Sequence, residues 1–289
     1  MEQCPTRRRL LAGAALGMLG MPAMARSWQP DRVTLPFLPA NAEPFRHYFY
    51  ELVELLMRRT EADDGPYVIE RFVHPQSNDR AIEALRTKTG PNLLWAGAGR
   101  KRESVMRPIR ISLLGELNSY RLLLIRAEDE HKFAHVQQLE NLRQFKAGMG
   151  QNWPDTEFVR CSRLPVVTSL HHRLLFAMLA GRRFDYYPRG LYEVWHEERT
   201  WAPSGLMIEP HLMLHWDVPI YFYVHPDHAS LAARIERGLK LLMADGSLAR
   251  LMLSYPLFEK GLREIENPQR VLIRLTQRCD SSPSPHPAM

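Results

Sequence analysis

The sequence contains few cysteines, and it has no long apolar run beyond its N-terminal segment. Its 289 residues include three cysteines, Cys4, Cys161 and Cys279. Two cysteines outside the N-terminal segment impose no disulfide framework on so long a chain, although an oxidising compartment would permit a bond between them. No stretch after residue 25 reaches the roughly 20 apolar residues that a transmembrane helix needs. These absences exclude a small disulfide-stapled scaffold and an integral membrane protein, so we expect a globular fold built on an apolar core.

The sequence also lacks a block of charge of one sign. Its formal net charge of +6 arises from 38 Lys and Arg and 32 Asp and Glu, and these residues are scattered along the chain. A scattered excess of this size does not make the basic patch that nucleic-acid binding requires. We therefore expect no nucleic-acid partner.

Metal and cofactor motifs are missing as well. Twelve histidines are present, but the best-spaced pair, His211 and His215, would need a helix where we expect a strand, and no third ligand lies nearby. The turn Gly97-Ala98-Gly99 lacks the third glycine and the acidic partner of a dinucleotide fingerprint. No nucleophile-elbow sequence is present. We expect no metal site, no cofactor and no catalytic nucleophile.

The N-terminal segment is typical of an export signal. Three arginines, Arg7 to Arg9, precede an apolar run of 16 residues from Leu10 to Ala25, which ends in a small-x-small sequence. The run is too short to span a bilayer as a helix, so residues 1–25 are predicted to be a cleaved signal peptide and the protein periplasmic. Paired arginines occur in twin-arginine signals and in ordinary secretory signals, so both export routes stay open. Cleavage would remove three arginines and Glu2, which lowers the net charge from +6 to +4.

Strand-like and helix-like segments alternate along the rest of the chain, which favours βαβ units and a mostly parallel sheet. The expected strands are 33–38, 67–73, 92–96, 109–113, 120–125, 146–150, 164–168, 184–187, 212–214 and 221–224. The expected helices are 45–59, 80–88, 134–145, 155–160, 171–180, 191–199, 229–244 and 247–254. Polar residues 77–79 offer an N-cap for the second of these helices.

Two such series joined by extended crossings predict an α/β fold with two lobes. The first lobe would combine residues 28–124 with 218–275, and the second lobe would hold residues 125–217. Crossings near residues 122–128 and 214–221 would form a hinge. The Ser- and Pro-rich residues 276–289 are expected to be a disordered tail.

The segment 181–190 is the strongest candidate for part of a binding site. Residues 184–187 are expected to form a buried strand, and Pro188 is expected to prevent its continuation as a central strand. Asp185 and Arg189 flank two tyrosines at the carboxyl end of this strand, where open α/β sheets bind ligands. The pattern would suit a zwitterionic or acidic solute. An ion pair between Asp185 and Arg189 that fixes a loop would explain the same residues.

Three stretches carry a family resemblance: Gly148-Met-Gly-Gln-Asn-Trp-Pro-Asp155, Phe176 to Gly190, and Leu239 to Leu251 with its Ala-Asp-Gly-Ser-Leu core. They resemble the bacterial periplasmic solute-binding proteins of the two-lobed type that are associated with uptake of polar amino acids. More narrowly, they resemble a branch labelled only as transporter substrate-binding domain proteins. The resemblance covers roughly residues 30 to 275. It implies a type II periplasmic binding fold that closes on a small ligand, with an inner-membrane transporter or a receptor as partner, and we expect a monomer.

The resemblance also implies the ligand contacts of the second lobe. The loop that ends at Trp153 corresponds to the loop that holds a ligand carboxylate at a helix start, where amide groups and the helix dipole favour an anion. Its candidate contacts are Gln151, Asn152 and Trp153. Asp185 corresponds to the position that holds the ligand's ammonium group. Tyr186 and Arg189 follow it and depart from the common pattern, which argues against a plain α-amino acid.

Two further contacts are implied in the first lobe. Arg110 would be the arginine that forks onto the ligand carboxylate, with Arg107 as a competing position and an exposed arginine as the alternative. Trp95 ends the third strand beside a glycine turn and would face either the cleft or the core.

The leading hypothesis is therefore a solute-binding protein, not an enzyme, that closes on a small polar or anionic, amino acid-like ligand for uptake or sensing. The alternative is an enzyme on the same fold, such as a dehydratase of a cyclic carboxylic acid. Glu193 or Asp185 would then act as its general acid or base.

Overall fold

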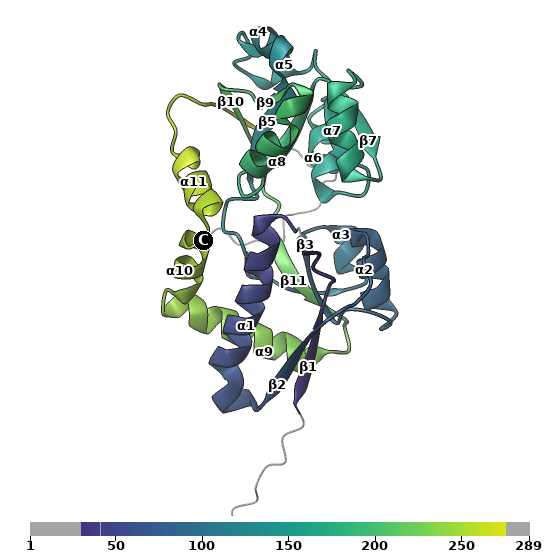
Figure 1. The fold of residues 1–289 in the computed structure, drawn as a ribbon, viewed down its shortest axis with the longest axis vertical. Helices are drawn as coiled ribbons and strands as arrows, with labels where there is room; N and C mark the ends of the chain where they lie inside the picture. Colours follow the sequence, from purple (N-terminus) through teal and green to yellow (C-terminus); the bar gives the residue numbers. More distant parts are fainter. Residues whose placement is uncertain (1–29, 41, 276–289) are drawn as a thin grey trace, which may run out of the picture.

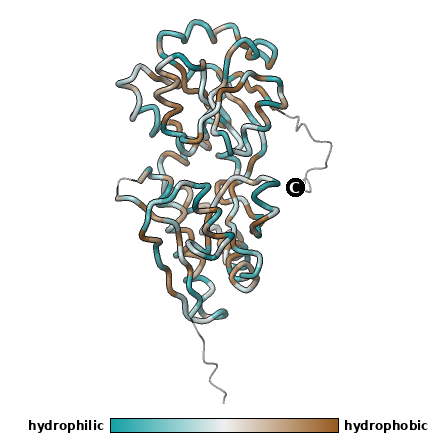
Figure 2. Tube along the Cα trace, turned by 90° about the vertical axis from the view of Figure 1, so that its right-hand side faces the viewer, coloured by the Kyte–Doolittle hydropathy of each residue, from teal (hydrophilic) through white to brown (hydrophobic). Residues whose placement is uncertain are grey.

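The computed structural model describes residues 30–40 and 42–275, so the predicted signal peptide (1–25) and the predicted tail (276–289) lie outside the described residues. The helices and strands form two bodies, stacked one above the other in Figure 1. We call the lower body the first lobe and the upper body the second lobe. Hydrophobic segments run through the interior of both (Figure 2).

The first lobe holds two small sheets. β1 (Asp31–Leu35) pairs in parallel with β2 (Tyr67–Arg71). β11 (Ile220–Val224) lies between β3 (Leu93–Gly97) and β4 (Arg107–Ile109) and is antiparallel to both. The helices of this lobe are α1 (Pro44–Asp64), α2 (Asn78–Arg86), α3 (Arg100–Glu103), α9 (Ala229–Ala244) and α10 (Ser247–Leu253). A late strand thus completes a sheet that the early part of the chain begins.

The second lobe is built on one larger sheet. Its strand order is β12-β10-β5-β8-β6-β7, with β9 paired to β5. The strands are β5 (Tyr120–Arg126), β6 (Ala147–Gly150), β7 (Val166–Ser169), β8 (Tyr186–Gly190), β9 (Leu206–Ile208), β10 (Leu212–His215) and β12 (Val271–Arg274). The helices are α4 (Glu130–Phe133), α5 (Leu139–Leu142), α6 (Pro154–Cys161), α7 (His172–Ala180) and α8 (Val194–Trp201), with 3-10 turns at Ala127–Asp129 and Ala202–Ser204.

Helix α1 shows how the sequence pattern builds the core of the first lobe. Its buried side chains recur every three or four residues, from Tyr48 through Leu52 and Leu56 to Thr60, which gives the helix one apolar face. Tyr48 packs edge-on against Phe258 of α11 (Pro256–Ile265) at 5.0 Å. α11 also packs through Gly261 against Leu117 and against Leu191, which directly follows β8. It therefore contacts both lobes.

The prediction that Pro188 ends its strand is wrong. β8 continues through Pro188 to Gly190 and pairs along its whole length with β5. On its other side, β8 pairs with β6 only at Tyr186. Pro188 therefore lies beyond the β6 pairing, at a position where a missing N–H removes no hydrogen bond of that ladder.

Other differences concern short elements. Of the expected helix 134–145, only the short helix α5 forms; α4 ends before it at Phe133, where the chain turns and the Phe133 carbonyl accepts from the amide of Val136. The sequence patterns also missed α3, α11, β9 and β12. The N-cap of α2 is confirmed, since the Ser77 hydroxyl accepts from the Arg80 amide, and α9 has the expected bounds.

The lobe boundaries differ from the expected ones at two places. β5, expected to lie mostly in the first lobe, is a central strand of the second-lobe sheet, so the first crossing is residues 110–119. β12, also expected in the first lobe, pairs in parallel with β10 of the second lobe. Within the described residues, the chain therefore crosses between the lobes three times, through residues 110–119, 216–219 and 254–270. Two crossings were expected.

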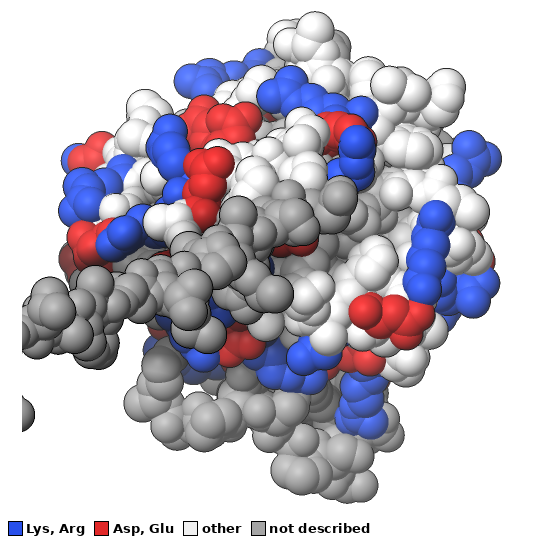
Figure 3. All heavy atoms as spheres, turned by 90° about the horizontal axis from the view of Figure 1, so that it is seen from below, with Lys and Arg blue, Asp and Glu red and all other residues white. Residues whose placement is uncertain are grey.

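Three further features of the described residues concern a cysteine, the length and apolar character of the helices, and the surface charge. Cys161 is disulfide-bonded, and Cys279 lies outside the described residues. Within residues 30–40 and 42–275, no helix combines the length and the apolar character needed to cross a membrane. Basic and acidic side chains lie next to one another over the face seen in Figure 3.

Candidate functional site

A cavity of about 450 Å³ lies between the two lobes. We call it the cleft. Its lining comes from α1, α2, β3 and α3 on the first lobe, and from the loops after β6 and β7, β8 and the start of α8 on the second. The charged residues of its lining are Glu43, Arg46, Asp79, Arg102, Arg121, Asp155, Arg173, Arg189, Glu193 and Glu197. The cleft is therefore a polar site with balanced charge rather than an apolar pocket.

Arg102 is the cation of the first-lobe wall that lacks an acidic partner. One of its terminal nitrogens donates to the Gly97 carbonyl at 2.8 Å. Burial lowers the pKa of Arg102, whereas Tyr223, and then Asp155 and Asp79, raise it. Among the described residues, no carboxylate pairs with this guanidinium, so its remaining N–H groups are available to an anion in the cleft.

Trp95 was expected to face either the cleft or the core, and it lines the cleft. Its ring stacks on Phe49 at 4.7 Å and meets Tyr50 edge-on at 5.3 Å. These two rings of α1 hold the indole at the end of β3. One face of Trp95 is thus used by the core, and the residue gives the first-lobe wall an aromatic surface.

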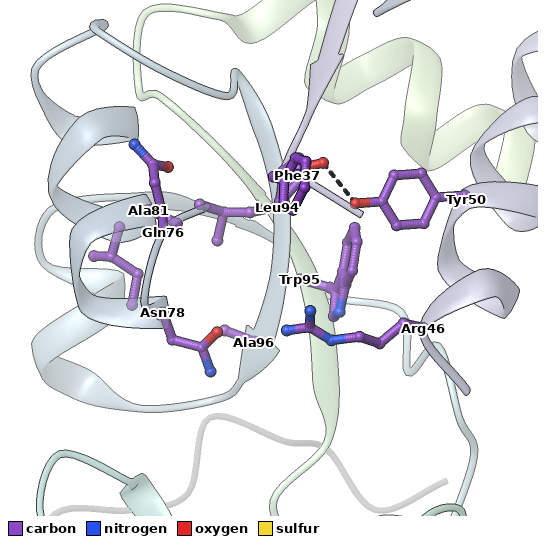
Figure 4. A pocket seen from close by; sticks show the side chains of 11 residues that line it. Phe37, Arg46, Tyr50, Gln76, Asn78, Ala81, Leu94, Trp95 and Ala96 are labelled. Carbon is purple, nitrogen blue, oxygen red and sulfur yellow. Dashed lines mark hydrogen bonds between the residues drawn. The ribbon is translucent and has the colours of Figure 1, made fainter. Parts of the chain in front are cut away.

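A narrow side pocket of about 50 Å³ opens beside Trp95, within the first lobe (Figure 4). Arg46, Gln76, Asn78, Trp95 and Ala96 line both this pocket and the cleft. The Tyr50 hydroxyl donates to the Pro36 carbonyl at 2.6 Å at its far side. The Gln76 Oε1 atom is buried without a hydrogen-bond partner. The side pocket extends the cleft by about the space of one or two small groups.

The loop after β6 places three of the predicted residues, Gln151, Asn152 and Trp153, in the cleft. Its shape is fixed by hydrogen bonds: the Gln151 amide donates to the Ser169 carbonyl at 2.9 Å, and the Thr156 hydroxyl donates to the Gly150 carbonyl at 2.6 Å. Pro154 occupies the first turn of α6, as expected.

The two lobes touch across the cleft. The Asn152 side chain donates to the Asp79 carboxylate of α2 at 2.7 Å, and Arg173 lies 3.5 Å from Glu43 of the loop before α1. A Cβ atom on Gly99 would lie 2.9 Å from the Pro154 ring, so the absence of a side chain at Gly99 permits this close approach. These contacts describe a closed arrangement of the lobes.

Arg189, the fifth predicted residue that lines the cleft, forms a buried cluster with two acids, Glu193 and Glu197, that follow it in the chain. Its guanidinium binds Glu197 through two nitrogens, at 2.7 and 2.6 Å, and lies 2.8 Å from Glu193. The same guanidinium lies over the rings of Tyr187 and Trp153, at 4.7 and 5.2 Å. We call these three charged residues the Arg189 cluster. All three are less than a tenth exposed.

Two carboxylates around one guanidinium leave the Arg189 cluster with an excess of negative charge. Burial raises the pKa of Glu193 to about 7, with Glu197 contributing, although Arg189 and Arg121 oppose the shift. The two acids hold the pKa of Arg189 well above its ordinary value, against the effect of burial. Near neutral pH, the cluster therefore carries an acid that is poised between its neutral and charged forms.

A second ion pair lies behind this cluster. Arg121 of β5 binds Asp155 of α6 at 2.5 Å, and the Trp216 indole N–H donates to the same carboxylate oxygen at 3.0 Å. These partners, with Arg121 first, keep the pKa of Asp155 below its ordinary value even though burial alone would raise it. The pair fixes the first turn of α6 and thereby the loop that carries Trp153.

Three predicted site residues do not line the cleft. Arg110 is exposed and binds Glu103 at 2.6 Å, and its competitor Arg107 is exposed as well. Asp185 precedes β8, where it accepts from the Lys146 amide at 2.8 Å and lies 3.3 Å from Arg126. Because Lys146 precedes β6, which is parallel to β8, Asp185 lies at the amino ends of these strands, whereas the cleft loops follow their carboxyl ends.

Tyr186 fails to line the cleft for a different reason. Successive side chains of a strand point to opposite faces of the sheet. Tyr187 and Arg189 share one face, where the guanidinium covers the phenol ring. Tyr186 lies on the other face, fully buried and edge-on to Phe133 at 6.3 Å.

Sequence reasoning missed Arg102, Asp79 and Glu197 as residues of the cleft. Glu193, considered as a general acid or base of the alternative enzyme, lines the cleft as well. A signal for Arg102 was present, since it follows the glycine turn 97–99 at the end of a buried strand. No group of three or more potential metal ligands was found in the described part of the chain.

Neither a family model nor a curated protein matches this sequence, whereas solved structures match the fold. An ancestral arginine-binding protein bound to glutamine is 13% identical, with a TM-score of 0.59, over 79% of this chain and 99% of that chain. A periplasmic His/Glu/Gln/Arg/opine family-binding protein from Silicibacter pomeroyi, in complex with lysine, is 10% identical, with a TM-score of 0.58, over 77% and 96%.

A third match is the ancestral amino acid-binding protein AncCDT-1, a precursor of cyclohexadienyl dehydratase. It is 12% identical, with a TM-score of 0.54, over 78% of this chain and 95% of that chain. At these identities the likeness establishes the fold. The predicted two-lobed α/β architecture is confirmed: the chain has the fold of the periplasmic amino acid-binding proteins.

Proposed function

We propose that the protein binds a small polar solute of amino acid type in the cleft and carries it to an inner-membrane transporter or a receptor. The observation that carries the proposal is the position of Arg102, a cation that lines a cavity between two lobes without an acidic partner among the described residues. A carboxylate on the solute would supply that partner, because a guanidinium donates two parallel hydrogen bonds to it.

Closure of the lobes fits this function. A solute that contacts both walls binds the closed arrangement more tightly than the open one. The difference between these two binding free energies is the amount by which the solute favours closure. Here Arg102 and Trp95 belong to the first lobe, whereas Trp153 and the Arg189 cluster belong to the second. One small molecule in the cleft would thus join the lobes.

Two independent observations support a location in the periplasm. The Silicibacter pomeroyi neighbour is periplasmic, and residues 1–25 have the pattern of an export signal. We propose that the protein is exported to the periplasm and acts there as a monomer.

One observation favours a second candidate, an enzyme that dehydrates a small carboxylic acid. Glu193 lies at the cleft, and its pKa is raised to about 7, which is the range in which a carboxyl group can act as a general acid at neutral pH. The name of the AncCDT-1 neighbour links this fold to such a reaction. Consumption of a cyclic hydroxy acid by the wild-type protein, and its loss in Glu193→Gln, would establish this candidate.

Binding is tested by a thermal-shift screen of amino acids, amines and organic acids on the full exported chain, followed by calorimetry of the solutes that raise the melting temperature. Loss of a charged hydrogen-bonded pair costs about 1.5–3 kcal/mol, so Arg102→Ala should weaken binding by roughly 10- to 100-fold. Arg110→Ala serves as the matched control and should leave the affinity within about twofold. If no solute stabilises the wild-type protein, or if Arg102→Ala binds as well as wild type does, the proposal is wrong.

A further inference from the structure

The C-terminal part of the described chain ties the two lobes together a third time. α11 follows α10 of the first lobe, and β12 belongs to the sheet of the second. In Figure 1, α11 and the segment that links it to β12 run along one edge of the molecule, whereas α2 and α6, which border the cleft, lie toward the opposite edge. We call residues 254–275 the strap.

Aromatic packing anchors the strap to the first lobe. Phe258 and Tyr255 meet Tyr48 of α1 edge-on, with ring centroids 5.0 and 5.6 Å away, and they stack on each other at 5.3 Å. Aromatic pairs of this geometry stabilise a contact beyond the area that they bury. The beginning of the strap is therefore fixed to the core of the first lobe.

The middle of the strap packs against the place where the lobes join. A Cβ atom on Gly261 of α11 would lie 2.7 Å from Leu117, in the first crossing, and 3.1 Å from Leu191, which follows β8. The Leu191 amide donates to the Leu117 carbonyl at 3.1 Å, so α11 covers a hydrogen bond between that crossing and the second lobe. Glycine inside a helix costs stability relative to alanine, and this close approach explains its presence here.

α11 lies on the reverse side of the cleft wall. Asn118 and Tyr192 line the cleft, and each directly follows a residue that packs against Gly261. The Lys260 ammonium of α11 lies 4.6 Å from the centre of the Trp195 ring, on α8 of the second lobe. A change in the angle between the lobes must therefore change the packing around α11.

Arg270 and β12 anchor the strap to the second lobe. One terminal nitrogen of Arg270 donates to the carbonyls of Glu209 and Leu212, which lie between β9 and the start of β10. Its Nε atom donates to the Glu264 carboxylate, in the last turn of α11, at 2.7 Å. One side chain thus joins α11 to the second lobe, and β12 then pairs along its whole length with β10.

We propose, on the basis of the solute-binding function inferred above, that the strap restrains the motion of the lobes and thereby raises the affinity for the solute. Two bodies joined by two crossings rotate about the line through them, and a third tie beside that line opposes the rotation. Because the strap is anchored on both bodies, opening must deform it or detach an anchor. The strap therefore keeps the lobes within a narrow range of angles near the closed arrangement.

The restraint is tested on the full exported chain without solute, by measuring the distance between two spin labels by pulsed electron paramagnetic resonance. Unnatural amino acids carry the labels at Glu83 of α2 and Glu157 of α6, two exposed positions on the helices that border the cleft. Two changes loosen the strap. Arg270→Met removes an anchor on the second lobe, whereas Gly-Gly-Ser inserted after the exposed Pro268 lengthens the strap and leaves its anchoring side chains in place.

Both changes should broaden the distribution of distances and shift it to longer values. Arg263→Met is the matched control, because Arg263 is exposed on the same helix and pairs with Glu259 of that helix; it should leave the distribution unchanged. The loosened variants should also bind the solute more weakly. A fall in the closed fraction from about a half to about a tenth lowers the affinity about fivefold, because the apparent dissociation constant varies inversely with the competent fraction.

Distance distributions equal to that of the wild type in both loosened variants would overturn the inference, whether or not a solute is found. If Arg270→Met does not fold, the insertion decides, since it removes no side chain. Distances that respond while the affinity for the solute found by the screen above stays within twofold would refute the effect on affinity. Failure of that screen refutes solute binding, whereas the spin labels still report on the restraint.

Discussion

The side-chain amide of Asn152 donates to the carboxylate of Asp79 at 2.7 Å, and this hydrogen bond joins the two lobes across the cleft. Asn152 belongs to the loop after β6, and Asp79 lies in the first turn of α2. Both side chains are exposed. Since the pair can form only when the lobes are close, it stabilises the closed arrangement directly.

Asn152→Asp should therefore weaken solute binding. The change removes the donor and places a second negative charge opposite Asp79, at a cost of about 1 kcal/mol, which corresponds to roughly 3- to 10-fold in affinity. Small-angle scattering of the solute-free protein should show a larger radius of gyration than wild type. Asn141→Asp is the control, because its side chain accepts the Gln137 amide far from the cleft. Equal radii for Asn152→Asp and wild type would contradict a role in closure.

Asp185→Asn should leave the affinity for solute within about twofold. Its carboxylate is used on the Lys146 amide and on Arg126, at the strand ends opposite the cleft. Because the group is about a third exposed, its loss should cost only ~1 kcal/mol of unfolding free energy. Urea denaturation and calorimetry of the same variant check both halves. A tenfold loss of affinity would restore Asp185 to the site.

Arg234→Met should destabilise the first lobe strongly. This buried arginine of α9 donates to the Thr60 hydroxyl, the Asp31 carboxylate and the Gly65 carbonyl, each at 2.9 Å. Without it, these acceptors lose their partner inside the lobe, so we expect a loss of about 2–4 kcal/mol by urea unfolding.

The matched control for this variant lies one turn further along α9. Arg237 is about half exposed and pairs with Asp64 of α1. Exposed ion pairs contribute little, so Arg237→Met should stay within about 1 kcal/mol of wild type. Equal losses of unfolding free energy for the two variants would show that the burial of Arg234 does not determine how much it stabilises the protein.

The ionisation of Glu193 should also appear in the stability of the solute-free protein. Its pKa is raised on folding, so between about pH 4.5 and 7 the folded state binds more protons than the unfolded state, and this group makes stability fall as pH rises. Glu193→Gln removes that loss. Relative to wild type, the variant should therefore have a larger free energy of unfolding, and so be more stable, at pH 8 than at pH 5. A difference that stays constant between these pH values would contradict the raised pKa.

Much of the local structure follows from the sequence because it depends on near neighbours. The apolar period of 229–244 fixed both ends of α9, and Pro154 with the preceding loop predicted the start of α6. β12 escaped prediction because four residues carry little periodic signal, and its pairing with β10 joins segments about sixty residues apart. The helix-like pattern of 134–145 misled for the opposite reason, since a helical period does not show that the chain turns between Phe133 and Val136.

The sequence by itself determined that the protein has two α/β lobes and that the loop from Gln151 to Trp153 follows a strand toward a ligand-binding edge. Only the tertiary structure decided which charges face that edge. Asp185 and Arg189 lie four residues apart, yet they lie at opposite ends of β8, and only Arg189 reaches the cleft. Arg102 rather than Arg110 reaches it from the other lobe, because the pairing of Arg110 with Glu103 holds that arginine in solvent. Strand direction, strand register and the approach of the two lobes fix these positions, and each depends on contacts between residues far apart in the chain.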